Sequence, residues 1–208
     1  MQIRLLLLAV TLTMATASNA VADRGVINDP DGFTNVRAAR SRESAIVARA
    51  KNGEQLDFNS DPNGDWWEVT LRSGKKGYMH SSRIRLHATM ADLADAPAND
   101  EIHIFARRAG LDLYPIARAA ARGDTTAMRR FFEFQSDGAA METHDALYLS
   151  VIHLVGDQKL AQFLAQSSAA ARNDMRDRLE NSSALPFEAK AYLKRHFPKT
   201  AALLFGVR

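Results

Sequence analysis

The sequence predicts a multidomain β plus α fold, in which a small antiparallel β-barrel precedes an all-helical domain. Residues 23–87 alternate short apolar segments with Asn-Gly and Asp-Pro turn signals, as strands and hairpins do. Residues 101–208 instead place Leu, Phe and Met at helical spacing. Between them, residues 88–100 are small and polar and contain Pro97, which is typical of a linker.

The first 22 residues have the three-part pattern of a signal peptide. Arg4 gives a positive start, an apolar run begins at Leu5, and small residues around Ala20 and Ala22 suit cleavage. The apolar run is shorter than the ~20 residues that a membrane span needs. We therefore expect a periplasmic protein that is not inserted in the membrane after the signal peptide is removed.

Composition excludes several kinds of site. The chain of 208 residues contains no Cys, so it forms no disulfides, thiol nucleophiles or thiolate metal sites. Its formal net charge is only +3, which is too small to predict a nucleic-acid partner. The excess of positive charge falls within residues 24–87, where it favours binding to an anionic surface such as the cell wall.

The clearest predicted strand covers residues 66–71, which are rich in aromatic and β-branched side chains. Successive side chains of a strand point to opposite faces, so we expect Trp67, Val69 and Leu71 in the core. Trp66 then lies on the outer face beside polar neighbours. An outward aromatic residue with a polar surround suits a binding site.

This part of the chain resembles bacterial SH3 (SH3b) domains in three segments that occur in the right order. The segments are Asp31–Arg37, Gly64–Val69 and Gly74–Ile84. The resemblance implies a small SH3-like barrel that binds rather than catalyses, often on cell-wall peptides. Eukaryotic SH3 domains place the first Trp of a Trp-Trp pair against proline-rich ligands, and Trp66 corresponds to it. The Pro and Tyr that complete that groove are replaced by His80 and Arg83, so we do not predict a proline-rich ligand.

The predicted ligand-binding residues lie on the outer face and one loop of the barrel. Trp66 and Tyr78 offer aromatic surface to a ligand. A basic group on the loop is formed by Arg37, Arg40 and Arg42. Because guanidinium groups bind carboxylates in a bidentate manner, this loop is expected to hold carboxylates.

The helical part contains two Gly-Asp pairs that divide predicted helices. Gly123-Asp124 and Gly156-Asp157 are 33 residues apart, and each precedes a helix with a Phe stripe. The period resembles that of ankyrin repeats, but their usual Thr-Pro-Leu-His signature is absent. We favour an ordinary helical bundle, with a short helical-repeat domain as the alternative. Basic pairs such as Lys194-Arg195 are interpreted as solvated helix faces.

The chain shows no motif for catalysis, cofactor binding or metal binding. None of the six His residues pairs with a second ligand at metal-binding spacing. Nucleotide-binding loops and nucleophile motifs are also missing. We therefore expect no enzymatic activity, no cofactor and no metal.

The leading hypothesis is a non-catalytic periplasmic binding protein that recognises an envelope ligand, either a peptidoglycan peptide or a protein, through its barrel. A second hypothesis is a periplasmic inhibitor or immunity protein that neutralises a toxin or hydrolase. A third is an envelope hydrolase with an unrecognised site. The sequence leaves open the oligomeric state and which domain carries the affinity.

Overall fold

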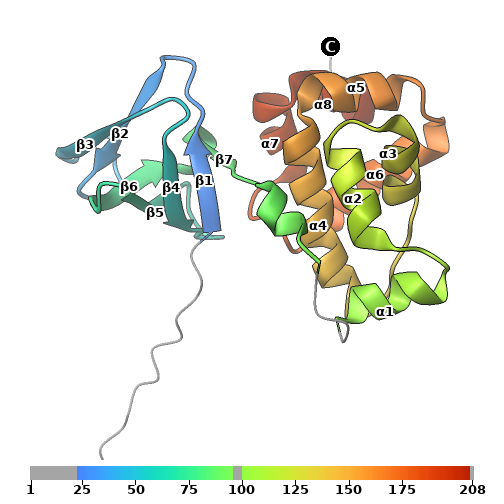
Figure 1. Cartoon of the computed structure of the whole chain (residues 1–208). Helices are drawn as coiled ribbons and strands as arrows, with labels where there is room; N and C mark the ends of the chain where they lie inside the picture. The colour runs from blue at the N-terminus through green and yellow to red at the C-terminus, as the bar shows by residue number, and fades with distance from the viewer. Residues whose placement is uncertain (1–22, 96–99, 207–208) are drawn as a thin grey trace, which may run out of the picture.

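A computed structural model describes residues 23–95 and 100–206 of the chain. The predicted signal peptide lies outside the described residues. An antiparallel sheet comes first and eight described helices follow, which confirms the predicted fold class. The two parts sit side by side and are joined through the last strand and the turn that follows it (Figure 1).

The N-terminal part is a single antiparallel sheet of seven strands that curls into a half-barrel. The strands are β1 (Asp23–Ile27), β2 (Phe33–Arg37), β3 (Ile46–Lys51), β4 (Gln55–Asn59), β5 (Trp66–Leu71), β6 (Lys76–His80) and β7 (Ile84–Leu86). Their order across the sheet is β3-β2-β6-β5-β4-β1-β7. This order places β2, β5 and β6 next to one another, so their outward side chains share one surface.

The concave side of the sheet holds an apolar core. The buried members of β5, as the alternation predicted, are Trp67, Val69 and Leu71. Phe58 stacks on Trp67 with 5.2 Å between ring centroids. The indole N–H of Trp67 donates to the carbonyls of Asp61 at 3.2 Å and Gly64 at 3.0 Å. Trp67 therefore fixes the turn between β4 and β5 as well as filling the core.

The helical part is a bundle arranged around its longest helix. The helices are α1 (Glu101–Arg108), α2 (Leu113–Ala121), α3 (Thr125–Phe132), α4 (Ala140–Val155), α5 (Asp157–Ala165), α6 (Ala169–Asn181), α7 (Ala189–His196) and α8 (Pro198–Phe205). Helix α4 contacts α1, α2 and α5. Gly123-Asp124 lies immediately before α3, whereas Gly156 precedes α5 and Asp157 is its first residue. The Asp124 side chain caps α3 by accepting the Ala127 N–H at 2.8 Å. The ankyrin-like alternative stays a prediction.

Part of the predicted linker is anchored to the helices. A short 3-10 turn covers Met90–Leu93, and the Leu93 side chain is fully buried in the helical core. Arg118 of α2 donates to the Leu93 carbonyl at 3.0 Å and pairs with Asp95 at 2.7 Å. This segment therefore holds the end of the sheet close to the bundle.

Candidate functional site

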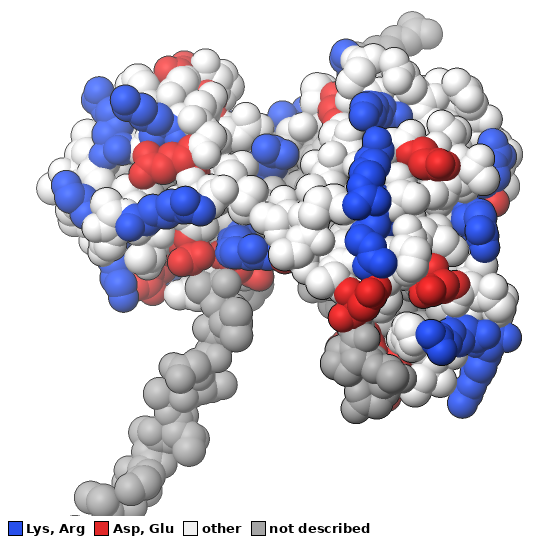
Figure 2. All heavy atoms as spheres, in the orientation of Figure 1, with Lys and Arg blue, Asp and Glu red and all other residues white. Residues whose placement is uncertain are grey.

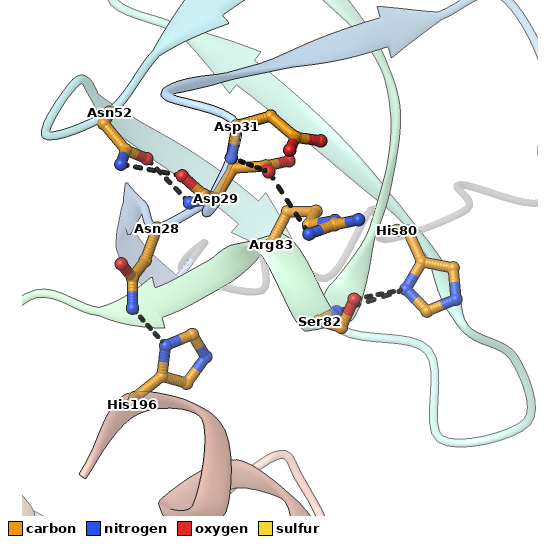
Figure 3. A network of polar contacts seen from close by, with 8 residues as sticks. All are labelled: Asn28, Asp29, Asp31, Asn52, His80, Ser82, Arg83 and His196. Carbon is orange, nitrogen blue, oxygen red and sulfur yellow. Dashed lines mark hydrogen bonds and ion pairs between the residues drawn. The ribbon is translucent and has the colours of Figure 1, made fainter. Parts of the chain in front are cut away.

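Helix α7 docks against the sheet through aromatic and polar contacts. The ring of Phe187, just before α7, has its centroid 4.6 Å from that of Trp67 in β5 and 4.6 Å from that of Tyr192 in α7. At the end of α7, the Asn28 side-chain amide donates to Nδ1 of His196 at 2.6 Å (Figure 3). Burial lowers the pKa of His196 to about 3, so its ring is neutral and able to accept this bond.

A buried relay of hydrogen bonds links α4, α7 and β7. Nδ1 of His153 lies 2.6 Å from the Leu149 carbonyl, which can only accept, so Nδ1 carries the proton. Nε2 of His153 therefore accepts from the Tyr192 hydroxyl at 2.7 Å, and that hydroxyl accepts the Leu86 N–H at 2.9 Å. Burial lowers the pKa of His153 to about 4. The relay is thus intact at neutral pH and holds the two parts of the chain together.

A groove of about 510 Å³ crosses the outer face of the sheet beside this junction. We call it the arginine groove, and it is lined among others by Arg37, Arg42, Arg83, Arg195, Trp66 and His80. Four arginines line it but only two acidic residues, Asp29 and Asp31. Because Arg195 belongs to α7, the helical part contributes directly to a groove that otherwise lies on the sheet.

One wall of the arginine groove is formed by Trp66 and His80. They are register partners on β5 and β6, and their ring centroids lie 5.7 Å apart in an edge-on arrangement. The His80 Nδ1 accepts the Ser82 N–H at 3.3 Å and lies 2.8 Å from the Ser82 hydroxyl (Figure 3). Burial lowers the pKa of His80, and the groove arginines lower it further against the opposing effect of Asp65. Trp66 is half-buried, so part of its ring remains open to a ligand.

The floor of the arginine groove is fixed by Asp29, which is only 3% exposed. Its carboxylate accepts from Arg83 at 3.2 Å and from the Asp31 N–H at 3.0 Å. Asn52 accepts the Asp29 N–H at 2.6 Å and donates to the Asp29 carbonyl at 2.8 Å (Figure 3). The charge of Arg83 is therefore balanced inside the fold.

The groove brings together three of the five predicted ligand-binding residues. These are Trp66, Arg37 and Arg42. Tyr78 and Arg40 are not among its lining residues. The Arg40 guanidinium lies over the Tyr78 ring, 5.4 Å from its centroid, and forms an ion pair with Asp61. Arg40 is thus already neutralised, so its charge is less available than that of the groove arginines.

The position of Arg37 is set by a close approach between β2 and β6. Arg37 is the register partner of Tyr78, and its guanidinium donates to the Ser44 carbonyl at 2.8 Å. At the neighbouring Gly77, an added Cβ would lie 2.5 Å from the Arg37 carbonyl oxygen and 2.7 Å from a methyl group of Val36. Only glycine allows the strands to meet here, and this contact places Arg37 at the groove.

The prediction from sequence missed Arg195 and the aspartates of the floor. Lys194-Arg195 reads as a solvated basic pair on a helix, and it is far from the sheet along the chain. In the fold both residues are exposed, but only Arg195 lines the groove. No local sequence pattern predicts that the end of α7 lies against the β1–β2 turn.

Charged side chains of both signs are spread over the rest of the described surface. Figure 2 shows basic and acidic side chains on both parts of the face in view, with a column of basic ones on the helical part. Within residues 23–95 and 100–206, no three His, Asp or Glu side chains gather closely enough to hold a metal ion. Among the helices of these same residues, none combines the length and apolar character that a membrane span requires.

Comparison with known proteins bears on the sheet alone. Among curated proteins, none matches this chain. A family model matches part of the chain. The matched residues include β2 to β6 and most of β7, and with them Arg37, Arg42, Trp66 and His80 of the groove. Arg195 and the helical part lie outside the matched residues. Residues 32–85 match the family described as bacterial SH3 domain, and the sheet of this protein is therefore similar to that domain.

Proposed function

We propose that this protein is a non-catalytic binding protein of the periplasm, and that its arginine groove holds an envelope peptide through the carboxylates of that peptide. The observation that carries the proposal is a single groove lined by four arginines and the half-buried Trp66. The match to a bacterial SH3 domain supports a binding role. The signal-peptide pattern supports the location.

The charges of the groove favour a ligand with carboxylates. Among the ion pairs of the described residues, Arg83 is matched by Asp29, but none involves Arg37, Arg42 or Arg195. A guanidinium offers a planar pair of N–H groups that fits a carboxylate. Trp66 adds a flat apolar surface beside them.

The size of the groove favours a short peptide over a protein surface. A volume of about 510 Å³ is that of a small-molecule site, which typically measures ~300–1,000 Å³. A peptidoglycan stem peptide has this size and carries several carboxylates. Among the proposed envelope ligands, we therefore favour the cell-wall peptide.

The groups that line the groove also favour binding without catalysis. Arginine does not exchange protons near neutral pH, so it serves poorly as a general acid or base. Asp29 is held by Arg83, and Nδ1 of His80 is held by Ser82. These side chains are fixed as walls and floor of the groove.

Titration with a synthetic peptidoglycan stem peptide tests the proposal, with the chain lacking its predicted signal peptide and with Trp fluorescence as readout. We expect saturable binding that Arg42→Gln weakens about tenfold, the loss expected for one charge-assisted contact. Lys75→Gln removes the same charge from an exposed turn outside the groove and is the matched control. Absence of binding, or equal affinity of both variants, would overturn the proposal.

A further inference from the structure

A second cavity, of about 530 Å³, opens between the sheet and α7 next to the arginine groove. We call it the junction cavity. One side is formed by residues 61–65, the turn between β4 and β5, and the other by residues 186–188 and α7. His80, Ser82 and Arg195 line both the cavity and the groove. The two hollows therefore adjoin, with Arg195 at their boundary.

The charge of the junction cavity is opposite to that of the arginine groove. Three carboxylates line it, from Asp61, Asp65 and Glu188, and Arg195 is the one Lys or Arg among its lining residues. Asp61 is paired with Arg40. Asp65 is exposed and takes part in none of the ion pairs of the described residues. Glu188 accepts the backbone N–H groups of Lys190 at 3.1 Å and Ala191 at 2.6 Å at the start of α7.

Aromatic rings give the junction cavity a fixed wall. Phe187 is half-buried there between Trp67 and Tyr192, with centroid distances of 4.6 Å to each. Trp67 belongs to the core of the sheet, and Tyr192 is tied to the buried relay. The wall is thus built from both parts of the chain. The faces of the Phe187 ring pack against Trp67 and Tyr192, so the carboxylates are the groups of the cavity that favour a cation.

We propose that the junction cavity is a second subsite of the same ligand and that it takes a primary ammonium group. The arginine groove then holds a carboxylate of the ligand, and the ligand is a peptide that carries both groups. This inference rests on the function proposed above, because it assumes that the groove binds a peptide. It makes the helical part a component of the binding site, through Glu188 and Arg195, rather than a separate module.

A pair of synthetic peptides tests the second subsite. Both are the same peptidoglycan stem peptide, one with a free side-chain amine and one with that amine acetylated, so that only the positive charge differs. Calorimetric titration of the chain without its predicted signal peptide should show affinity about two- to fivefold lower for the acetylated peptide, the range expected for a partly exposed charge contact.

Two variants test whether the preference for the peptide with the free amine arises in the junction cavity. Asp65→Asn should remove most of the difference between the two peptides, because it removes a charge from the cavity. Asp57→Asn, at an exposed position of β4 that does not line the cavity, should keep the difference. Thermal unfolding followed by circular dichroism checks that both variants fold like the unaltered protein.

The outcomes separate this inference from the function on which it rests. If neither peptide binds, the proposed function itself fails. If the unaltered protein binds both peptides equally, the groove stands as a peptide site but the junction cavity is not an ammonium subsite. If Asp65→Asn keeps the full preference for the free amine, the amine is recognised elsewhere and the inference is overturned.

Discussion

The hydroxyl of Tyr192 donates to Nε2 of His153 at 2.7 Å, and this bond fixes α7 on α4. The same hydroxyl accepts the Leu86 N–H at 2.9 Å, so one side chain connects α4, α7 and β7. Arg195 follows three residues after Tyr192 on α7, close to one turn further along the helix. The bond between Tyr192 and His153 thus sets where the guanidinium of Arg195 lies relative to the groove.

Tyr192→Phe should destabilise the protein by about 1–3 kcal/mol. The substitution keeps the ring but leaves the Leu86 N–H and Nε2 of His153 buried without a partner, which is costly. Urea unfolding followed by circular dichroism measures the change. Tyr78→Phe is the control, because no hydrogen bond of the Tyr78 hydroxyl is found among the described residues, and it should lie within about 0.5 kcal/mol of the unaltered protein. Equal losses in both variants would contradict the relay.

Stability should fall as the pH drops from 7.5 to 5.5. Burial lowers the pKa of His144 to about 3, of His153 to about 4 and of His196 to about 3. In the unfolded chain these residues bind protons below about pH 6.5, whereas the folded protein keeps them neutral. Each His should therefore cost about 1 kcal/mol of unfolding free energy at pH 5.5. Urea midpoints at pH 7.5 and 8.5 should agree, and a midpoint at pH 5.5 as high as theirs would show that these rings are not buried as described.

The two adjacent tryptophans should respond in opposite ways to substitution. Trp66→Ala should change the unfolding free energy by less than about 1 kcal/mol but abolish most stem-peptide binding, because its ring is half-buried at the groove. Trp67→Ala should cost about 3–5 kcal/mol, because it removes a buried ring from the core. Denaturant unfolding and peptide titration on both variants check this. A strongly destabilised Trp66→Ala would assign that residue to the core instead.

Arg195→Gln should weaken stem-peptide binding about two- to fivefold, although the residue is remote from the sheet in sequence. Its guanidinium carries one of the unpaired charges at the groove. Lys194→Gln changes the same charge at the preceding, exposed position of α7, which does not line the groove, and should bind normally. Calorimetric titration compares the two, and equal affinities would remove the helical part from the site.

Gly77→Ala should destabilise the sheet by about 1–3 kcal/mol, because its Cβ would meet the Arg37 carbonyl oxygen at 2.5 Å. The strands must separate to relieve this contact, which also displaces Arg37 from the groove. Gly64→Ala is the control, since a Cβ there makes only ordinary contacts with Asp61, beginning at 3.6 Å. Thermal unfolding of both variants checks the prediction, and a fully stable Gly77→Ala would refute the close approach of β2 and β6.

Local sequence patterns were sufficient to predict a β part followed by a helical part, and to predict which side chains of β5 point into the core. Alternation placed Trp67 inward and Trp66 outward because the side-chain period of a strand is two residues, whatever the rest of the fold does. The burial of Leu93 was not predictable in the same way. It lies in a stretch that reads as a linker, and only the helical core decides that it is covered.

The candidate site was predictable only where it is local to the sheet. Trp66, Arg37 and Arg42 fall on segments with recognisable strand and turn patterns. Asp29 looks like an ordinary turn residue, and its burial depends on Arg83 and Asn52 approaching from elsewhere in the sheet. Contacts between segments distant in the chain leave no periodic trace in the sequence.

Nuclear magnetic resonance of the indole N–H groups tests the central claim most directly. The chain contains two Trp residues, so two indole signals report on the two faces of β5, and Trp66→Phe assigns them. On addition of a peptidoglycan stem peptide, we predict that the Trp66 signal shifts in a saturable manner. The Trp67 signal, whose N–H is bonded to the carbonyls of Asp61 and Gly64, should move far less. An unchanged Trp66 signal at saturating peptide would contradict binding in the arginine groove.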